Sequence, residues 1–244
     1  MLLGLLYHNV GNGKYANSLS FFESHFKWIA DHYITKLPGE KVSSKLEVCL
    51  TFDDAFFDFY YFIFPLLKKY KLKALLSVPT AFIPKTTQLS PQNRLDKIFT
   101  LSERSRRLAS PAFCTWEELK ELQDSSIIEI ASHSVNHLPL TSSKVDPIYE
   151  LQKSKDTLES KLKGKIQTFV YPYGKLSPQV HKYAKNYYPY LMRIGNAINY
   201  SWTNCNRLFY RVNGDQLPHK KTPFLIRNKF KYFYNLPLNI LRNK

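Results

Sequence analysis

The chain has 244 residues, which suits a single α/β domain with or without a short appendage. Apolar residues make up 44% of the chain and aromatic residues 15%, so a sizeable core is available and wholesale disorder is disfavoured. The formal net charge of +16 indicates either a basic solvated surface or contact with polyanions such as anionic lipid headgroups, nucleic acid or a phosphate-bearing substrate.

The N-terminal segment and the cysteines bear on the cellular compartment. Residues 1–10 are apolar but lack the basic region and the cleavage site of a signal peptide, so we predict a first strand there. Cys49, Cys114 and Cys205 are far apart and form no CxxC pair, which favours buried or free thiols in a reducing compartment. No stretch approaches the ~20 apolar residues of a membrane span, so a cytoplasmic protein is expected.

Apolar segments of strand length alternate with helical patterns along the chain. The predicted strands are Leu2–Tyr7, Leu46–Phe52, Lys73–Val78, Ile127–Ala131, Ile166–Tyr171, Tyr190–Ile194 and Leu208–Val212. The predicted helices are one with an apolar face from Phe22 to Tyr33, then Phe57–Tyr70, Trp116–Leu122, Asp146–Lys163 and one that opens at Ser177-Pro178. This βαβα alternation favours a parallel sheet, open or closed into a barrel, with its functional side chains at the carboxyl ends of the strands.

Two stretches break this rhythm. Residues 84–111 are long, polar and basic in parts, which favours a loop over the active site. Residues 216–244 mix aromatic and aliphatic side chains with seven basic residues and no acidic one. This composition favours either an interfacial membrane segment or a segment that packs on the domain through its aromatic side chains. Pro237 is expected to interrupt any long helix there.

Two motifs that follow predicted strands could share one metal ion. Asp53 and Asp54 end the strand Leu46–Phe52, and burying two adjacent carboxylates is costly without a cation or hydrogen bonds. One carboxylate can bind a metal while its neighbour stays free as a base, although an Asp-Asp turn that caps the next helix is the alternative. His133 and His137 are four residues apart, so on a helical turn both would point the same way. A carboxylate with two imidazoles suits Zn²⁺, whereas two unrelated surface histidines are the other interpretation.

Two weaker signals lie at further strand ends. The stretch Phe169–Gly174 runs from a strand into a Pro/Gly turn, which either forms a simple turn or presents backbone N–H groups to a developing oxyanion. Tyr7 and His8 end the first predicted strand. A histidine at such a place is usually structural, but beside a metal site it can serve as a general acid.

The order and spacing of these motifs together resemble the polysaccharide deacetylase family, the NodB-homology domain of carbohydrate esterase family 4. Thr51–Asp54 resembles the first family motif, Thr115–Leu119 through Glu129–His137 resembles the run into the His-x-x-x-His motif, and Val170–Gly174 resembles the third. The resemblance covers about residues 1–195. We therefore expect a NodB-like deacetylase domain over residues 1–215, with a long loop at 84–111, and a basic aromatic C-terminal extension over 216–244.

The resemblance implies an α/β fold, namely an irregular and mostly parallel (β/α) barrel, often with seven strands. It implies a hydrolase that removes an N-acetyl, or sometimes a formyl, group from an amino sugar with one divalent metal ion, usually Zn²⁺. Carried over position by position, the metal ligands would be Asp54, His133 and His137. Asp53 would be the catalytic base, and the backbone N–H of Tyr173 would help to form the oxyanion hole.

Two departures from the family pattern resemble one subgroup. Val170 stands where much of the family has an arginine that orients the base, and His219 matches the usual late acid histidine poorly. The circularly permuted deacetylases that act on poly-N-acetylglucosamine carry a Tyr-His on their opening strand, which Tyr7-His8 matches. We therefore predict His8 rather than His219 as the general acid.

The substrate stays open between several classes. An amino sugar on a polyprenyl-phosphate carrier or glycolipid, at the inner face of the cytoplasmic membrane, fits the lack of a signal peptide. The basic C-terminal third would then meet the phosphate of the carrier and anionic headgroups, which implies peripheral membrane contact. Deacetylation of an exported polysaccharide, such as poly-N-acetylglucosamine or peptidoglycan, is the rival enzymatic interpretation. A catalytically silent glycan-binding relative is the non-enzymatic one, and a nucleic-acid partner is not expected because no such binding signature occurs.

Overall fold

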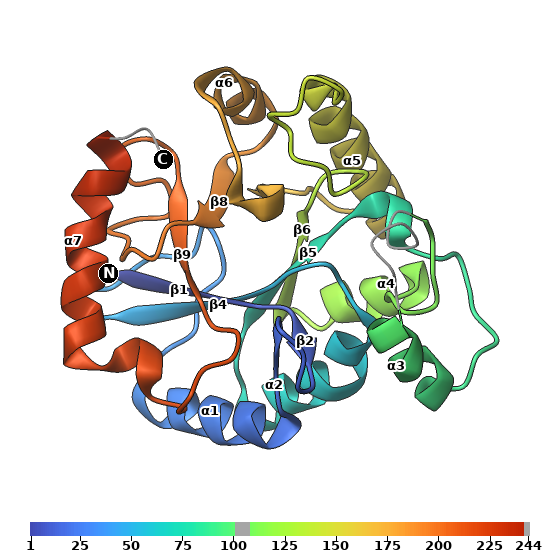
Figure 1. The fold of residues 1–244 in the computed structure, drawn as a ribbon, viewed down its shortest axis with the longest axis horizontal. Helices are drawn as coiled ribbons and strands as arrows, with labels where there is room; N and C mark the ends of the chain where they lie inside the picture. The colour runs from blue at the N-terminus through green and yellow to red at the C-terminus, as the bar shows by residue number, and fades with distance from the viewer. Residues whose placement is uncertain (101–107, 242–244) are drawn as a thin grey trace.

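The computed structural model, which describes residues 1–100 and 108–241, has a closed barrel of parallel strands at its centre (Figure 1). Within these residues the barrel strands, in spatial order, are β1 (Leu2–Tyr7), β4 (Glu47–Phe52), β5 (Ala74–Val78), β6 (Ile128–Ser132), β7 (Thr168–Val170), β8 (Tyr190–Ile194) and β9 (Phe209–Asn213). Strand β9 pairs with β1 and closes the ring. The prediction of a seven-stranded (β/α) barrel is confirmed.

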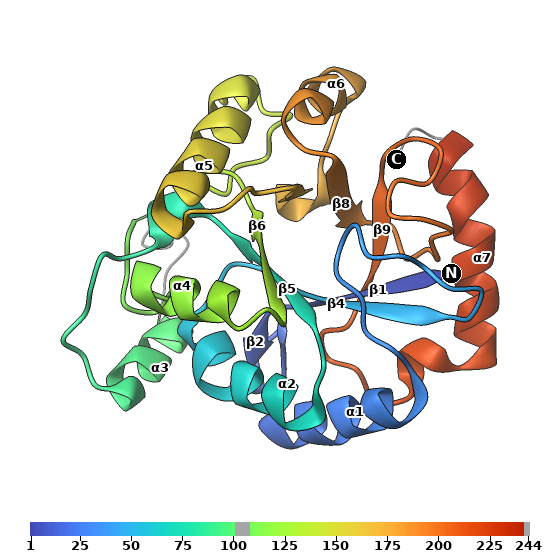
Figure 2. The same cartoon turned by 180° about the vertical axis from the view of Figure 1, so that it is seen from behind.

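Helices form the outer layer of the molecule (Figures 1 and 2). They are α1 (Leu19–His32), α2 (Phe64–Tyr70), α3 (Pro91–Thr100), α4 (Trp116–Asp124), α5 (Pro147–Leu162), α6 (Pro178–Tyr187) and α7 (Ile226–Leu241). The connections contain the short helical turns η1 (Phe59–Ile63), η2 (Thr80–Phe82), η4 (Pro172–Gly174) and η5 (Thr222–Phe224), and the paired strands β2 (Asn9–Val10) and β3 (Ala16–Asn17). The predicted strands are all present, with ends displaced by a residue or two.

The barrel interior is layered, because alternate residues of each strand point inwards. One layer is apolar and consists of Leu2, Cys49, Leu75, Ala131, Val170, Met192 and Phe209, with Trp202 packed beside them. Two residues further along their strands, Thr51, Ser77 and Arg211 place polar groups at the next level. These groups hydrogen-bond to one another or to Asp53, so the apolar interior ends in a polar floor near the carboxyl ends of the strands.

The stretch 84–111, predicted as a loop, contains helix α3. Arg94 anchors this helix, because its guanidinium is buried, forms two ion-paired hydrogen bonds to Glu118 of α4 at 2.6 and 2.9 Å, and lies 3.5 Å from the ring centroid of Phe57. The first part of this stretch is therefore fixed to the side of the barrel. Its basic residues Arg104, Arg106 and Arg107 lie outside the described residues.

Helix α7 continues through Pro237, so the prediction that this proline would interrupt a C-terminal helix is wrong. Pro237 lies on the exposed side of α7, where its missing N–H removes a single helical hydrogen bond. Contacts on the opposite side hold the helix, since Tyr232 and Leu236 are buried against the barrel layer. The side-chain amides of Asn235 and Asn239 also donate to the carbonyl oxygens of residues 196 and 195, each at 2.8 Å.

The N-terminal segment forms β1, whose six residues are all buried, which confirms the predicted first strand. Cys49 and Cys114 are buried, Cys205 is exposed, and all three are free thiols. Among the helices that the structure describes, none combines the length and the apolar character that crossing a bilayer requires.

Candidate metal and catalytic site

Residues from several strand ends line one pocket at the carboxyl end of the barrel, with a volume of about 360 Å³. His8 follows β1, Asp53 and Asp54 follow β4, His133 follows β6, and Tyr173 lies in η4 after β7. The pocket wall thus contains all the predicted site residues, which are His8, Asp53, Asp54, His133, His137 and Tyr173. His219, the alternative acid, is not among the lining residues in the described part of the chain.

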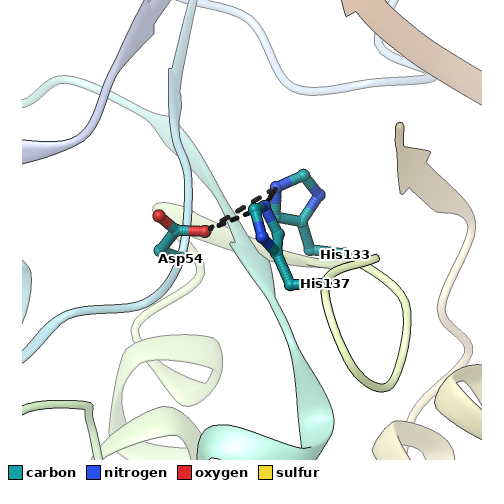
Figure 3. A group of neighbouring side chains, drawn as sticks. All are labelled: Asp54, His133 and His137. Atoms are coloured by element: carbon teal, nitrogen blue, oxygen red, sulfur yellow. Dashed lines mark hydrogen bonds and ion pairs between the residues drawn. The ribbon is translucent and has the colours of Figure 1, made fainter. Parts of the chain in front are cut away.

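Asp54, His133 and His137 direct one ligand atom each toward a common point (Figure 3). The Oδ1 atom of Asp54 lies 3.4 Å from Nε2 of His137 and 3.8 Å from Nε2 of His133. The two Nε2 atoms are 3.1 Å apart. Ligands in tetrahedral coordination around Zn²⁺, each about 2.0–2.2 Å from the ion, are separated by about 3.4 Å. The three atoms therefore have the mutual spacing of a divalent-metal site.

The chemistry of these three side chains also fits a cation. Oδ1 of Asp54 is buried and accepts no hydrogen bond from the residues that the structure describes, which is costly for a carboxylate unless a positive charge is beside it. His133 donates from Nδ1 to the carbonyl oxygen of Val170 at 2.8 Å, so its Nε2 presents a lone pair to the site. Burial lowers the pKa of His133 to about 4, which keeps the ring neutral at pH 7. A neutral imidazole is the form that binds a metal.

The two histidines lie on a loop and not on the helical turn that their spacing predicted. Ser134 and His137 adopt left-handed backbone conformations, with φ of 67° and 49°, and these fold the loop so that both rings face the same side. The carboxylate of Glu150 on α5 accepts the backbone N–H groups of Val135 and Asn136 at 2.7 and 2.9 Å. This buried glutamate fixes the loop that carries both rings.

Asp54 owes its orientation to an unusual turn after β4. Asp54 and Ala55 have φ values of 75° and 55°, a conformation that costs energy for residues other than glycine. The turn is held by backbone hydrogen bonds from Cys114 to Ala55 and from Phe57 to Ala112, at 2.9 and 2.8 Å. The strained turn points the Asp54 carboxylate toward the histidines.

Asp53 is paired with Arg211, a residue that the sequence patterns did not single out. Nη1 and Nη2 of Arg211 donate to the two carboxylate oxygens of Asp53 at 2.7 and 2.9 Å, and Ser77 donates to Oδ1 at 2.8 Å. Burial would raise the pKa of Asp53, but the charge and hydrogen bonds of Arg211 hold it well below its ordinary value. The carboxylate is therefore ionised in the pocket. Arg211 holds Asp53 from β9, whereas Val170 occupies the position at which the sequence resemblance expected an arginine.

His8 is oriented by Asp215, which lies just after β9. The ring Nδ1 of His8 and Oδ2 of Asp215 are 2.7 Å apart, and the backbone N–H of His8 donates to Oδ1 at 3.1 Å. Burial alone would lower the pKa of His8, but the hydrogen bond and charge of Asp215, aided by Asp53 and Asp54, raise it to about 9. The raised pKa favours the protonated form of the His8 ring at neutral pH.

Tyr173 forms part of the pocket wall. Its backbone has φ of 57°, in the turn η4, and its ring centroid lies 4.7 Å from that of His137. Tyr15 adds a second aromatic ring to the pocket lining, with its centroid 5.4 Å from that of His8. Aromatic rings thus lie beside both His137 and His8 in the pocket.

Sequence reasoning missed Arg211, Asp215 and Glu150, although each left a signal. Arg211 is a lone charged residue within the apolar strand Leu208–Val212, and a charge there needs a buried partner. Asp215 is the single acidic residue after Gly174, in an otherwise basic stretch. Both signals indicate a partner without identifying it, because the partners lie more than 150 positions away in the sequence.

The fold and the site define a parallel (β/α) barrel with a polar, metal-compatible pocket at its strand ends. A family model described as Polysaccharide deacetylase matches residues 40–189, which is more than half of the chain. The chain belongs to the polysaccharide deacetylase family. The family expected from the sequence motifs is thereby confirmed.

Individual relatives agree with this assignment. YxkH of Bacillus subtilis (strain 168), which is assigned to the polysaccharide deacetylases, is 27% identical over 195 residues. That match spans 74% of this chain but only 60% of YxkH, less than two thirds of the relative.

Solved structures share the fold. The Streptococcus pyogenes deacetylase PplD, in complex with acetate, has a TM-score of 0.72 and 22% identity, over 95% of this chain and 97% of that one. The de-N-acetylase from Aggregatibacter actinomycetemcomitans has a TM-score of 0.71 and 20% identity, over 92% of this chain and 99% of that one. At these identities the likeness establishes the barrel fold.

Replacing Arg211 with methionine should lower the free energy of unfolding by about 3–5 kcal/mol, because it leaves the buried Asp53 carboxylate without its cation. The double variant Asp53→Asn/Arg211→Met should cost less than the sum of the single variants, since neither charge is then buried alone. Urea unfolding measures both effects. Arg193→Met on neighbouring β8 is the control, and an equal loss in that variant would contradict this account of the Arg211 pair.

Removing the carboxylate of Glu150 should weaken Zn²⁺ binding without removing a ligand. Glu150→Ala frees the loop that carries both histidines, so we expect an affinity loss of roughly 10–100-fold, and a smaller one for Glu150→Gln. Competition with a chromogenic chelator measures the affinity. Glu117→Ala, at an exposed position on α4, is the matched control. Unchanged affinity in a folded Glu150→Ala protein would show that the loop does not depend on this residue.

Proposed function

We propose that this protein is a metal-dependent hydrolase that removes an N-acetyl group from an amino sugar. The observation that carries the proposal is the pairing of two neighbouring carboxylates with different partners. Asp54 faces His133 and His137, whereas Asp53 is held apart by Arg211. Such a division suits one carboxylate that binds a cation and another that accepts a proton. Membership of the polysaccharide deacetylase family supports the same reaction.

The metal ligands in this proposal are Asp54, His133 and His137. One carboxylate oxygen and two imidazole nitrogens suit Zn²⁺ and leave positions for water and substrate. A divalent ion at this place would supply a Lewis acid beside the amide carbonyl and would acidify water.

Asp53 is the proposed general base. Its ionisation is secured by Arg211 and Ser77, so it can accept a proton at neutral pH. Its Oδ2 lies 3.9 Å from Nε2 of His133, a separation that supports a base next to the proposed metal ligands. The guanidinium also fixes the direction of the carboxylate, because both oxygens are bound.

His8 is the proposed general acid, and the backbone N–H of Tyr173 is the proposed oxyanion donor. Held by Asp215, the His8 ring lines the pocket and can give its proton to the leaving amine. A positioned N–H at Tyr173 would stabilise the charge that develops on the carbonyl oxygen. The Tyr7-His8 pair at the end of β1 resembles the Tyr-His of the circularly permuted subgroup, and this resemblance supports His8 as the general acid.

The proposed substrate is an amino sugar on a lipid-phosphate carrier or glycolipid at the cytoplasmic face of the membrane. The pocket volume of about 360 Å³ is near the lower end for small-molecule sites, which suits one sugar unit. The aromatic rings of Tyr15 and Tyr173 offer apolar faces to such a ring. The basic residues of 216–244 suit a phosphate-bearing carrier. Faster turnover of poly-N-acetylglucosamine or peptidoglycan fragments than of a lipid-linked sugar would favour the exported polymer instead.

Asp53→Asn and His133→Ala should both fold and yet fail to release amines from acetylated oligosaccharides or lipid-linked amino sugars. We expect Asp53→Asn to lose roughly 10²–10⁴-fold in kcat, because the proton acceptor is gone. Asp124→Asn and His32→Ala, at exposed positions, are the matched controls and should keep full activity. Full activity in either site variant would remove this assignment, and no activity in the wild-type protein loaded with Zn²⁺ would favour a silent glycan-binding relative.

The pH dependence of kcat/KM should report His8. Because the acid must be protonated, activity should fall as pH rises through the pKa of His8, at or below about pH 9. Asp215→Asn removes the hydrogen-bonded charge that raises this pKa, so the basic limb should move to lower pH. His8→Ala should abolish the limb along with most of the activity. An unchanged basic limb in His8→Ala would assign the acid to another group.

A further inference from the structure

The outward side of helix α7 carries a stripe of exposed apolar side chains. Ile226, Phe230, Tyr234 and Leu241 are 73%, 72%, 69% and 79% exposed, and Pro237 lies among them. These positions follow one another at intervals of three or four residues, so they occupy one face of the helix. Figures 1 and 2 both place α7 at the outer edge of the molecule. Only a partner can remove this apolar face from contact with water, and the surfaces of soluble proteins rarely expose such a stripe.

The exposure of this stripe does not come from a loosely attached helix. On the inner side of α7, Tyr232 and Leu236 are 6% and 2% exposed and belong to the main core cluster. The backbone carbonyl of Tyr232 accepts the N–H of Ile198 at 3.2 Å, and the side chain of Asn239 donates to the carbonyl of Gly195. Helix α7 therefore has two apolar faces, one packed against the barrel and one exposed on the outside of the molecule.

Positive charges border the stripe. Arg227 and Lys231 are exposed and lie next to each other along one flank of the outward face. Lys220 and Lys221 precede the helix, and residues 216–244 contain no acidic side chain. Apolar side chains in the middle of a face, with basic ones at its edge, form the pattern of helices that lie in the headgroup region of a bilayer. The charges then attract anionic lipids and extend toward their headgroups.

We propose that the outward face of α7 binds the surface of an anionic lipid bilayer, with Ile226, Phe230, Tyr234 and Leu241 inserted among the lipids and Arg227 and Lys231 on the headgroups. The helix lies in the plane of the surface and does not span it. An acidic protein partner would meet the charges, but a membrane also accounts for the four highly exposed apolar side chains on the outward face of α7. This docking is independent of the proposed chemistry, because none of these residues lines the pocket.

Sedimentation of the full chain with vesicles tests the proposal without any substrate. We expect binding to phosphatidylcholine vesicles that contain about 30% phosphatidylglycerol, little binding to pure phosphatidylcholine, and release at high salt. Phe230→Ser/Tyr234→Ser should weaken binding by at least about tenfold, because the inserted rings are lost. Arg227→Glu/Lys231→Glu should weaken it by at least about 20-fold, since each basic side chain near an anionic surface contributes about 1 kcal/mol.

Matched variants separate a specific face from general stickiness. Ile34→Ser/Tyr200→Ser changes two apolar residues that are each 63% exposed, and Lys120→Glu/Lys153→Glu makes the same charge change on α4 and α5. The affinity of both control proteins for anionic vesicles should stay within about twofold of the wild-type affinity. Circular dichroism should show equal folding in all variants, because every changed position is exposed.

Three results would overturn the proposal. Absence of vesicle binding in the wild type would do so, as would equal loss of binding in the control variants. Concentration-dependent dimers that Phe230→Ser/Tyr234→Ser dissociates, without vesicle binding, would assign the stripe to contact between two copies of the chain. Vesicle binding in an enzymatically silent protein would leave this inference standing while the proposed function failed.

Discussion

Two adjacent carboxylates at the end of one buried strand set the conditions that the rest of the site satisfies. Asp53 is buried with Arg211 across two hydrogen bonds, and that pair uses the one arginine that reaches the barrel floor from β9. Asp54 has no arginine partner in the described part of the chain, and its buried Oδ1 faces the two histidine rings instead. A buried carboxylate needs a nearby positive charge. Arg211 supplies that charge to Asp53, whereas Asp54 requires a bound cation.

Closure of the barrel brings these parts together. Strand β1 lies between β4 and β9, so the pairing of first and last strands places His8 beside Asp215, and Arg211 beneath Asp53. The proposed base Asp53 and the proposed acid His8 are thus each held by a residue of β9 or just after it. The proposed metal ligands come from the end of β4 and from the loop after β6. Loss of β9 would therefore remove the partners that orient both Asp53 and His8.

The sequence predicted local features well and distant partners poorly. Strand positions, the order of motifs and the side chains His8, Asp53, Asp54, His133 and His137 could be found because apolar periodicity and short spacing are local properties. Arg211, Asp215 and Glu150 could not, since their partners are set by which strands and helices pack together. The histidine loop and α7 show the same limit. The loop that carries the histidines is shaped by left-handed residues and by the Glu150 carboxylate, and not by the predicted helical turn. Helix α7 continues through Pro237 because side chains on its inner face pack against the barrel layer.

The most direct test of the central claim is anomalous diffraction from crystals of the protein grown with Zn²⁺. The account predicts one anomalous peak about 2.0–2.2 Å from an Asp54 oxygen and from Nε2 of both His133 and His137. Asp53 should remain bound to Arg211 and outside the coordination sphere. No peak at this position, or a peak coordinated by Asp53 with the histidine rings turned away, would contradict the division of roles between the two carboxylates.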